Sequence, residues 1–142
     1  MIRLKSYLRL VRASALYDLL VTLGFATPWT FAVIHSSLTM FHEAVGAQGV
    51  LPVFDATHTL MANLLGSIVT VWSILRLRAP RILYGHYDAG ARFLFAAWQI
   101  YAVAHGASGI ILVFTFFELL FGITQCMPIK DREAEILTPS HG

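Results

Sequence analysis

The sequence predicts an all-α protein, a four-helix transmembrane bundle with both chain ends in the cytoplasm. The first reason is composition: of 142 residues, 57% are apolar and only 13% are charged, and the mean hydropathy is +0.68. Soluble domains are about 25% charged. The second reason is that four long apolar runs follow one another, and the third is the placement of the basic residues. So little polar surface excludes a single soluble domain.

The first predicted helix covers residues 13–35, which at 1.5 Å per residue is long enough to cross about 30 Å of hydrocarbon. Gly24 and Pro28 lie inside this run, and they predict a kink. Residues 1–12 form a basic N-terminal segment, which either extends the helix or lies as a short amphipathic piece on the inner surface. The apolar run is too long for a signal peptide and no cleavage site follows it, so we expect the helix to be retained.

Three further helices are predicted over residues 56–77, 88–105 and 109–127. Residues 36–55 hold two glycines and a proline, which predict a loop with room for a short amphipathic helix near its start. Ala79-Pro80 ends the second helix.

The glycines around Ala107-Ser108 predict a tight reversal between the third and fourth helices, and Pro128 closes the last one. Residues 13–128 are therefore expected to form one membrane domain, followed by a polar cytoplasmic tail over 129–142.

The orientation follows from the lysines and arginines, which fall in three clusters. They are Arg3, Lys5, Arg9 and Arg12 before the first helix, Arg76, Arg78, Arg81 and Arg92 around the second connection, and Lys130 and Arg132 after the last helix. Four crossings place all three clusters on one side of the membrane, and basic loops stay in the cytoplasm. We therefore expect a bacterial inner-membrane protein with both termini inside.

Each predicted helix carries a stripe of polar or small residues, which is expected to face the bundle interior because lipid cannot satisfy polar groups. Glu118 is the most costly of them, since it lies about ten residues from either end of its helix, near the bilayer centre. It therefore needs a proton or a partner, and Arg92 and Gln99 are the candidates. Asp18 lies at a depth similar to that of Arg92, which predicts an Asp18–Arg92 pair.

The polar core predicted from these residues comprises Glu118, Arg92, Asp18, Asn63 and Gln99. Two interpretations remain open for it. It could be a cavity that binds a small ligand or relays protons, or a buried network that fixes the helix register.

Histidines gather on the side opposite the basic clusters. His35 ends the first helix, His58 begins the second and His105 ends the third. If they converge, these imidazoles could bind zinc or copper, or ligate a haem. No pair has ligand-type spacing, and histidine is common at interfaces, so the simpler expectation is no cofactor.

Other chemistries lack their sequence patterns. The sequence has no phosphate loop, nucleophile elbow, CxxC or Rossmann pattern. The single cysteine, Cys126, excludes an intrachain disulfide. The basic clusters are explained by topology, so no nucleic-acid partner is expected, and an enzyme is less favoured than a binding protein.

The order and lengths of the four helices, the short turn between the last two, and the stretch GHYDAGAR from Gly85 to Arg92 resemble small bacterial four-helix membrane proteins of the DoxX-like type. The long loop with His42 and Glu43 departs from that layout. The resemblance implies an inner-membrane protein that is an accessory to redox or quinone-linked systems, and it carries over no catalytic residue.

Three functions therefore remain, and one of them, a proton- or ion-coupled transporter, needs more spans than one copy offers and would require a dimer. The favoured one is a non-enzymatic membrane protein that binds a small apolar or amphipathic ligand, or that is an accessory subunit of a membrane complex with other membrane proteins. The alternative is a membrane redox protein, or a haem- or metal-binding subunit, that uses His35, His58 and His105.

Overall fold

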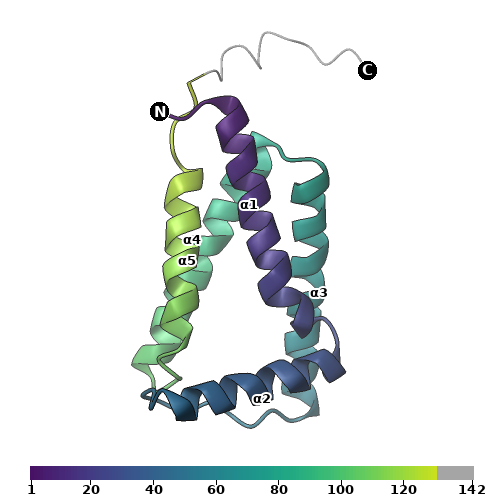
Figure 1. Cartoon of the computed structure of the whole chain (residues 1–142), viewed down its shortest axis with the longest axis vertical. Helices are drawn as coiled ribbons and strands as arrows, with labels where there is room; N and C mark the ends of the chain where they lie inside the picture. Colours follow the sequence, from purple (N-terminus) through teal and green to yellow (C-terminus); the bar gives the residue numbers. More distant parts are fainter. Residues whose placement is uncertain (131–142) are drawn as a thin grey trace.

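A computed structural model describes residues 1–130, and this part of the chain is helical without a named strand. The elements are α1 (Leu4–Thr22), the 3-10 turn η1 (Leu23–Phe25), α2 (Pro28–Ala44), α3 (Ala56–Arg78), α4 (Ile82–Ala104) and α5 (Ile111–Gln125). Four helices run along the long axis of the molecule, and α2 lies across one end (Figure 1). The predicted all-α bundle is confirmed at this level.

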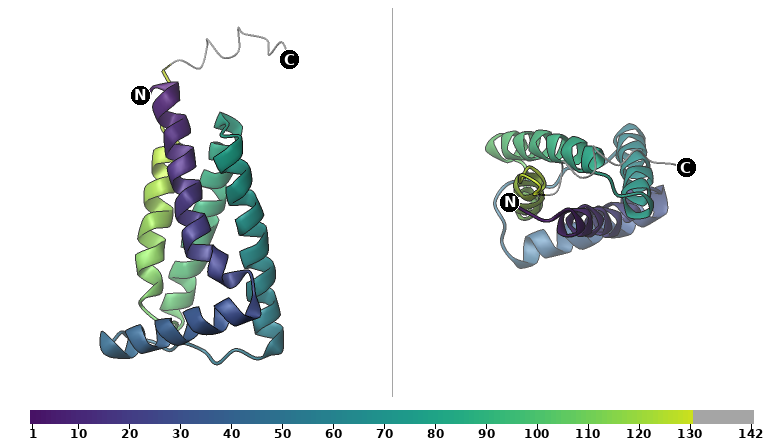
Figure 2. Two further views of the ribbon diagram at one scale, coloured as in Figure 1. Left: turned by 45° about the vertical axis from the view of Figure 1, so that its right-hand side comes forward. Right: turned by 90° about the horizontal axis from the view of Figure 1, so that it is seen from above.

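The helices form two pairs, because α1 packs mainly against α3 and α4 mainly against α5. Figure 1 shows α1 and α5 diverging toward the end where α2 lies, and the view from above in Figure 2 shows α2 passing beneath the bundle. At the opposite end the two ends of the described chain meet. There Ile2 donates its N–H to Pro128 and accepts one from Lys130, each at 2.9 Å.

The single helix predicted over 13–35 is wrong, because the chain bends by 101° between η1 and α2. Pro28 has no N–H and occupies the first turn of α2, a position where none is needed. A residue before proline is driven toward extended backbone, and Thr27 accordingly has φ −133° and ψ 150°. Its side chain accepts the N–H of Thr30 and caps α2. The sequence predicted a kink here, and the structure has a corner.

Three other boundaries differ from the prediction because the helices extend further than expected. The basic segment 1–12 belongs largely to α1, and α2 continues to Ala44 through the first part of the predicted loop. The third predicted helix begins at Ile82 and not at residue 88. Gly85 lies inside α4, where a Cβ would collide with the Tyr7 hydroxyl. The helices predicted over 56–77 and 109–127 agree with α3 and α5 to within two residues.

By length and composition, α3 is the helix of residues 1–130 that could cross a membrane on its own. The bent unit from Leu4 to Ala44 passes the same test when its two parts are taken together, and α5 is apolar but has only 15 residues.

The middle of α3 exposes large apolar side chains, while two polar residues near its C-terminal end are buried. Leu64, Ile68 and Val71 are each more than 60% exposed. Ser73 and Arg76 of the same helix are fully buried. This distribution is the reverse of that in a water-soluble helix, which buries its apolar face.

Candidate functional site

Five charged side chains from four helices meet in the interior of the bundle. Asp18 comes from α1, Arg76 from α3, Asp88 and Arg92 from α4, and Glu118 from α5. We call these five residues the charge network. Because each pair of helices contributes to it, the network joins the α1–α3 pair to the α4–α5 pair.

Arg92 forms ion pairs with all three acids of the network. Its Nη2 donates to Oδ2 of Asp18 at 2.6 Å, its Nε to Oδ2 of Asp88 at 2.9 Å, and its Nη1 to Oε2 of Glu118 at 2.8 Å. The fork of five donors in a guanidinium allows this, whereas a lysine presents a single point charge. Asp88 and Arg92 are four residues apart, so the helix itself brings them together.

Arg76 binds two of the same carboxylates from the other side. Its Nη2 lies 2.6 Å from Oδ2 of Asp18, and its Nη1 lies 2.6 Å from Oδ2 of Asp88. The side chain of Arg76 is fully buried and that of Arg92 is 2% exposed, while those of Asp18 and Glu118 are 12% exposed. The cations therefore lie inside and the more accessible members are acids.

Neutral polar groups complete the contacts around Asp88. Nε2 of Gln125 donates to Oδ2 of Asp88 at 2.9 Å and to the Ser14 hydroxyl at 2.7 Å, and the Trp72 indole donates to Oδ1 at 3.2 Å. The Tyr7 hydroxyl donates to the backbone carbonyl of Gln125 at 2.9 Å. Charged groups that leave water need such donors, because otherwise the cost of desolvation exceeds their mutual attraction.

Both predicted partnerships of Arg92, with Asp18 and with Glu118, are present in the structure. Sequence reasoning did not include Arg76 and Asp88 among the site residues, because Arg76 was counted as a topology determinant and Asp88 as the start of a helix. A usable pattern was present for each. Asp88 lies four residues before Arg92, and Arg76 lies one turn after Ser73, on the predicted polar stripe of its helix.

Asn63 and Gln99, the other two predicted members of the polar core, lie apart from the network. The Asn63 side-chain amide donates to the backbone carbonyl of Phe25 at 2.7 Å, which fastens α3 to the corner before α2. Oε1 of Gln99 accepts the Thr115 hydroxyl at 2.8 Å and links α4 to α5. These residues hold helices together at separate points.

The three histidines proposed as metal or haem ligands have other neighbours. Nε2 of His35 lies 3.0 Å from the Pro52 carbonyl oxygen, and the His105 ring stacks on Tyr101 with centroids 4.0 Å apart. His58 lies against Asp55, 2.9 Å from its carboxylate. The pKa of Asp55 lies below its usual value, mainly because its carboxylate accepts a hydrogen bond from the backbone N–H of His58. Within residues 1–130, no group of three or more His, Cys, Asp or Glu side chains is placed to hold a metal ion.

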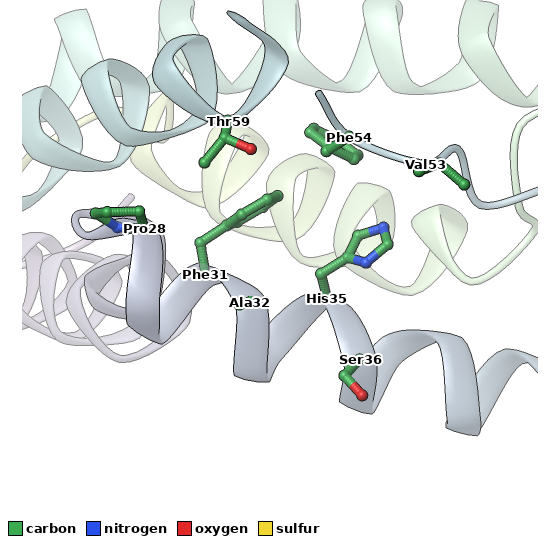
Figure 3. Close-up of a pocket in the computed structure, with 8 residues that line it drawn as sticks. All are labelled: Pro28, Phe31, Ala32, His35, Ser36, Val53, Phe54 and Thr59. Carbon is green, nitrogen blue, oxygen red and sulfur yellow. The ribbon is translucent and has the colours of Figure 1, made fainter. Parts of the chain in front are cut away.

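A pocket of about 280 Å³ lies between α2 and the segment that leads into α3 (Figure 3). Its lining is Pro28, Phe31, Ala32, His35, Ser36, Val53, Phe54 and Thr59. The rings of Phe31 and Phe54 meet edge to face, with centroids 5.0 Å apart. Figure 3 shows the His35 ring directed between α2 and residues 53–54, and the Ser36 hydroxyl directed away. We call this site the α2 pocket.

The corner between η1 and α2 gives the α2 pocket its shape. A Cβ at Gly66 of α3 would lie 2.6 Å from the carbonyl carbon of Phe25, so only glycine lets α3 approach the corner this closely. Together with the hydrogen bond from Asn63 to Phe25, this contact fixes where α2 begins. The α2 pocket begins at Pro28, the first residue after this corner.

Comparison of the chain with known protein families, with curated proteins and with solved structures finds no match in any of the three. The functional argument therefore depends on the charge network and the α2 pocket. The network offers ion pairing and proton binding, and the pocket offers an aromatic wall with an imidazole beside it.

Proposed function

We propose that this chain is a small multi-pass protein of the bacterial inner membrane. In this proposal α1, α3, α4 and α5 cross the bilayer, and α2 lies along its outer surface. The observation that carries it is the reversed distribution of polarity: Leu64, Ile68 and Val71 point outward, while Arg76 and Arg92 are buried. In water such a surface would aggregate, whereas lipid favours it.

Helix lengths support the proposal. The 23 residues of α3 and of α4 extend about 34 Å each, close to the hydrocarbon thickness of about 30 Å. The bend of 101° before α2 would turn that helix into the plane of the membrane surface. The 15 residues of α5 extend only about 22 Å, so it would cross with the help of the segments at its ends.

The basic residues support the orientation. Exposed basic residues at the N-terminal end of α1 lie at the end of the bundle opposite α2 (Figure 1). At this same end the backbone N–H of Lys130 donates to the carbonyl of Ile2. The positive-inside rule would put this end in the cytoplasm and α2 outside.

Cysteine labelling tests location and orientation together. Cys126→Ser provides a background without cysteine, into which single cysteines are introduced at Ser6 and Gln48, both exposed. In intact bacterial cells a membrane-impermeant maleimide should label the Gln48 position, and it should label the Ser6 position only after permeabilisation. The reverse pattern would overturn the orientation, and recovery of the protein without membranes would overturn the membrane location.

Within the membrane, the proposed activity is that of a non-enzymatic binding protein or accessory subunit, in line with the DoxX-like resemblance. The charge network is occupied by contacts among its own members, whereas the α2 pocket has apolar rings and one imidazole to offer. Such a lining suits the acyl chain of a small amphipathic molecule with an acidic end, because His35 could pair with a carboxylate.

A photoactivatable fatty acid tests this binding site. The variant Ala32→Phe fills the α2 pocket, and Ser37→Phe adds the same ring to an exposed position of α2 that does not line it. We expect Ala32→Phe to lose most of the labelling of α2 and Ser37→Phe to retain it. Equal labelling of the two variants would show that the probe does not use the pocket.

A further inference from the structure

The charge network contains more acid than base. It holds three carboxylates, those of Asp18, Asp88 and Glu118, and two guanidiniums, those of Arg76 and Arg92, all connected by ion pairs of 2.9 Å or less. With every member ionised, its formal charge would be −1. In the membrane interior, where the proposed function puts it, an uncompensated charge is strongly disfavoured.

The three carboxyl groups are not compensated equally. Asp18 contacts both arginines. Asp88 also contacts both, and it accepts further hydrogen bonds from Gln125 and Trp72. Among the ion pairs of the described residues, Glu118 has one, to Arg92 through Oε2. Glu118 therefore loses least when it becomes neutral.

The groups that surround Glu118 also favour its neutral form. From α4 it meets Arg92, whose charge is shared with Asp18 and Asp88. From α1, Asp18 binds the same guanidinium as Glu118. Tyr17, the residue before Asp18, packs its ring on Phe117 and Phe121 of α5. Glu118 thus shares its one arginine with two aspartates, and the neighbouring aromatic rings carry no positive charge.

We infer that Glu118 holds a proton in the resting protein, so that the network is neutral. The proton is taken up from solvent as the bundle assembles, and no other bond forms or breaks. Oε2 continues to accept from Arg92, and the hydroxyl of the neutral carboxyl lies on Oε1, the oxygen away from that contact. This inference rests on the proposed membrane location, and it makes Glu118 the proton-binding member of the charge network.

Amide substitutions test the inference, because an amide copies the shape of a neutral carboxyl but not its ionised form. We expect Glu118→Gln to change the equilibrium constant of unfolding in detergent micelles by less than about threefold. The matched variants Asp18→Asn and Asp88→Asn each leave an arginine under-compensated, and they should change it by about a hundredfold or more. If Glu118→Gln destabilises as much as Asp18→Asn, Glu118 is ionised and the inference is wrong.

Infrared spectroscopy gives a direct second measurement that does not depend on how the aspartate variants fold. A protonated carboxyl group has a C=O absorption separate from that of carboxylates. We expect this band in the wild-type protein at neutral pH and its loss in Glu118→Gln. Absence of the band from the wild type, or its persistence in Glu118→Gln, would overturn the inference. The cysteine labelling reports on the membrane location independently, so failure of one is distinguishable from failure of the other.

Discussion

At the scale of single residues, Arg92 allows three carboxyl groups to lie close together inside the bundle. Its guanidinium contacts Asp18, Asp88 and Glu118 through three different nitrogens. Arg76 shares two of these acids, but it has no contact with Glu118 among the ion pairs of residues 1–130. The two arginines are therefore not equivalent, and the loss of Arg92 leaves Glu118 without a cation.

Arg92→Leu should destabilise the bundle by about 3–5 kcal/mol, because it removes one of the two cations that compensate the buried Asp18 and Asp88 and leaves Arg76 alone with both. The measurement is reversible unfolding of the purified protein in detergent. Arg12→Leu is the matched control, since Arg12 is exposed near the N-terminal end of the same bundle. Equal stability of Arg92→Leu and Arg12→Leu would mean that the network adds nothing to folding.

At the scale of helices, the corner between η1 and α2 depends on contacts from α3. Asn63 donates to the Phe25 carbonyl, and Gly66, one turn later, lets the two backbones come close. Thr27 then caps α2 and Pro28 starts it. The direction of α2 is thus set by a few residues at the corner, and the α2 pocket depends on them.

Gly66→Val should cost about 1–3 kcal/mol, since its Cβ would lie 2.6 Å from the Phe25 carbonyl carbon and 2.8 Å from the Ala26 nitrogen. Gly90→Ala is the opposite case, because nothing lies within 4 Å of a Cβ there and the residue is inside α4. It should stabilise the protein by about 0.5–1 kcal/mol. The same unfolding assay serves both variants, and a Gly66→Val protein as stable as the wild type would contradict the close approach.

The sequence predicted helices well where hydrophobicity decides the structure and poorly where single contacts do. The boundaries of α3 and α5 follow their apolar runs. The corner does not, because an apolar run looks the same whether it is straight or bent at Pro28, and the contact of Gly66 with Phe25 joins distant parts of the chain. The ion pairs of Arg92 could be predicted, because its expected depth in the membrane matched that of Asp18. Arg76 was assigned to the topology of the chain and was therefore not recognised as a member of the charge network.

At the scale of the whole molecule, the outer surface of α3 offers a test that separates lipid from water. Ile68 is 62% exposed near the middle of this helix. Ile68→Lys should cost about 2.5–3.5 kcal/mol of insertion free energy and reduce the amount of protein in membranes. Thr57→Lys, at the exposed start of α3, should insert normally. Normal membrane levels of Ile68→Lys would mean that this face meets water or a polar partner.

The charge network also imposes an order on biosynthesis. Asp18 is synthesised with the first helix. The two arginines that pair with it, Arg76 and Arg92, follow it in the chain by 58 and 74 positions. At 5–20 residues per second, Arg76, the earlier of the two arginines, leaves the ribosome roughly 3–12 s after Asp18. During that interval the nascent α1 carries an acid with no arginine to meet it. In the proposed membrane location, the first helix would therefore wait in a hydrated setting, or with its acid neutral, until the later helices arrive.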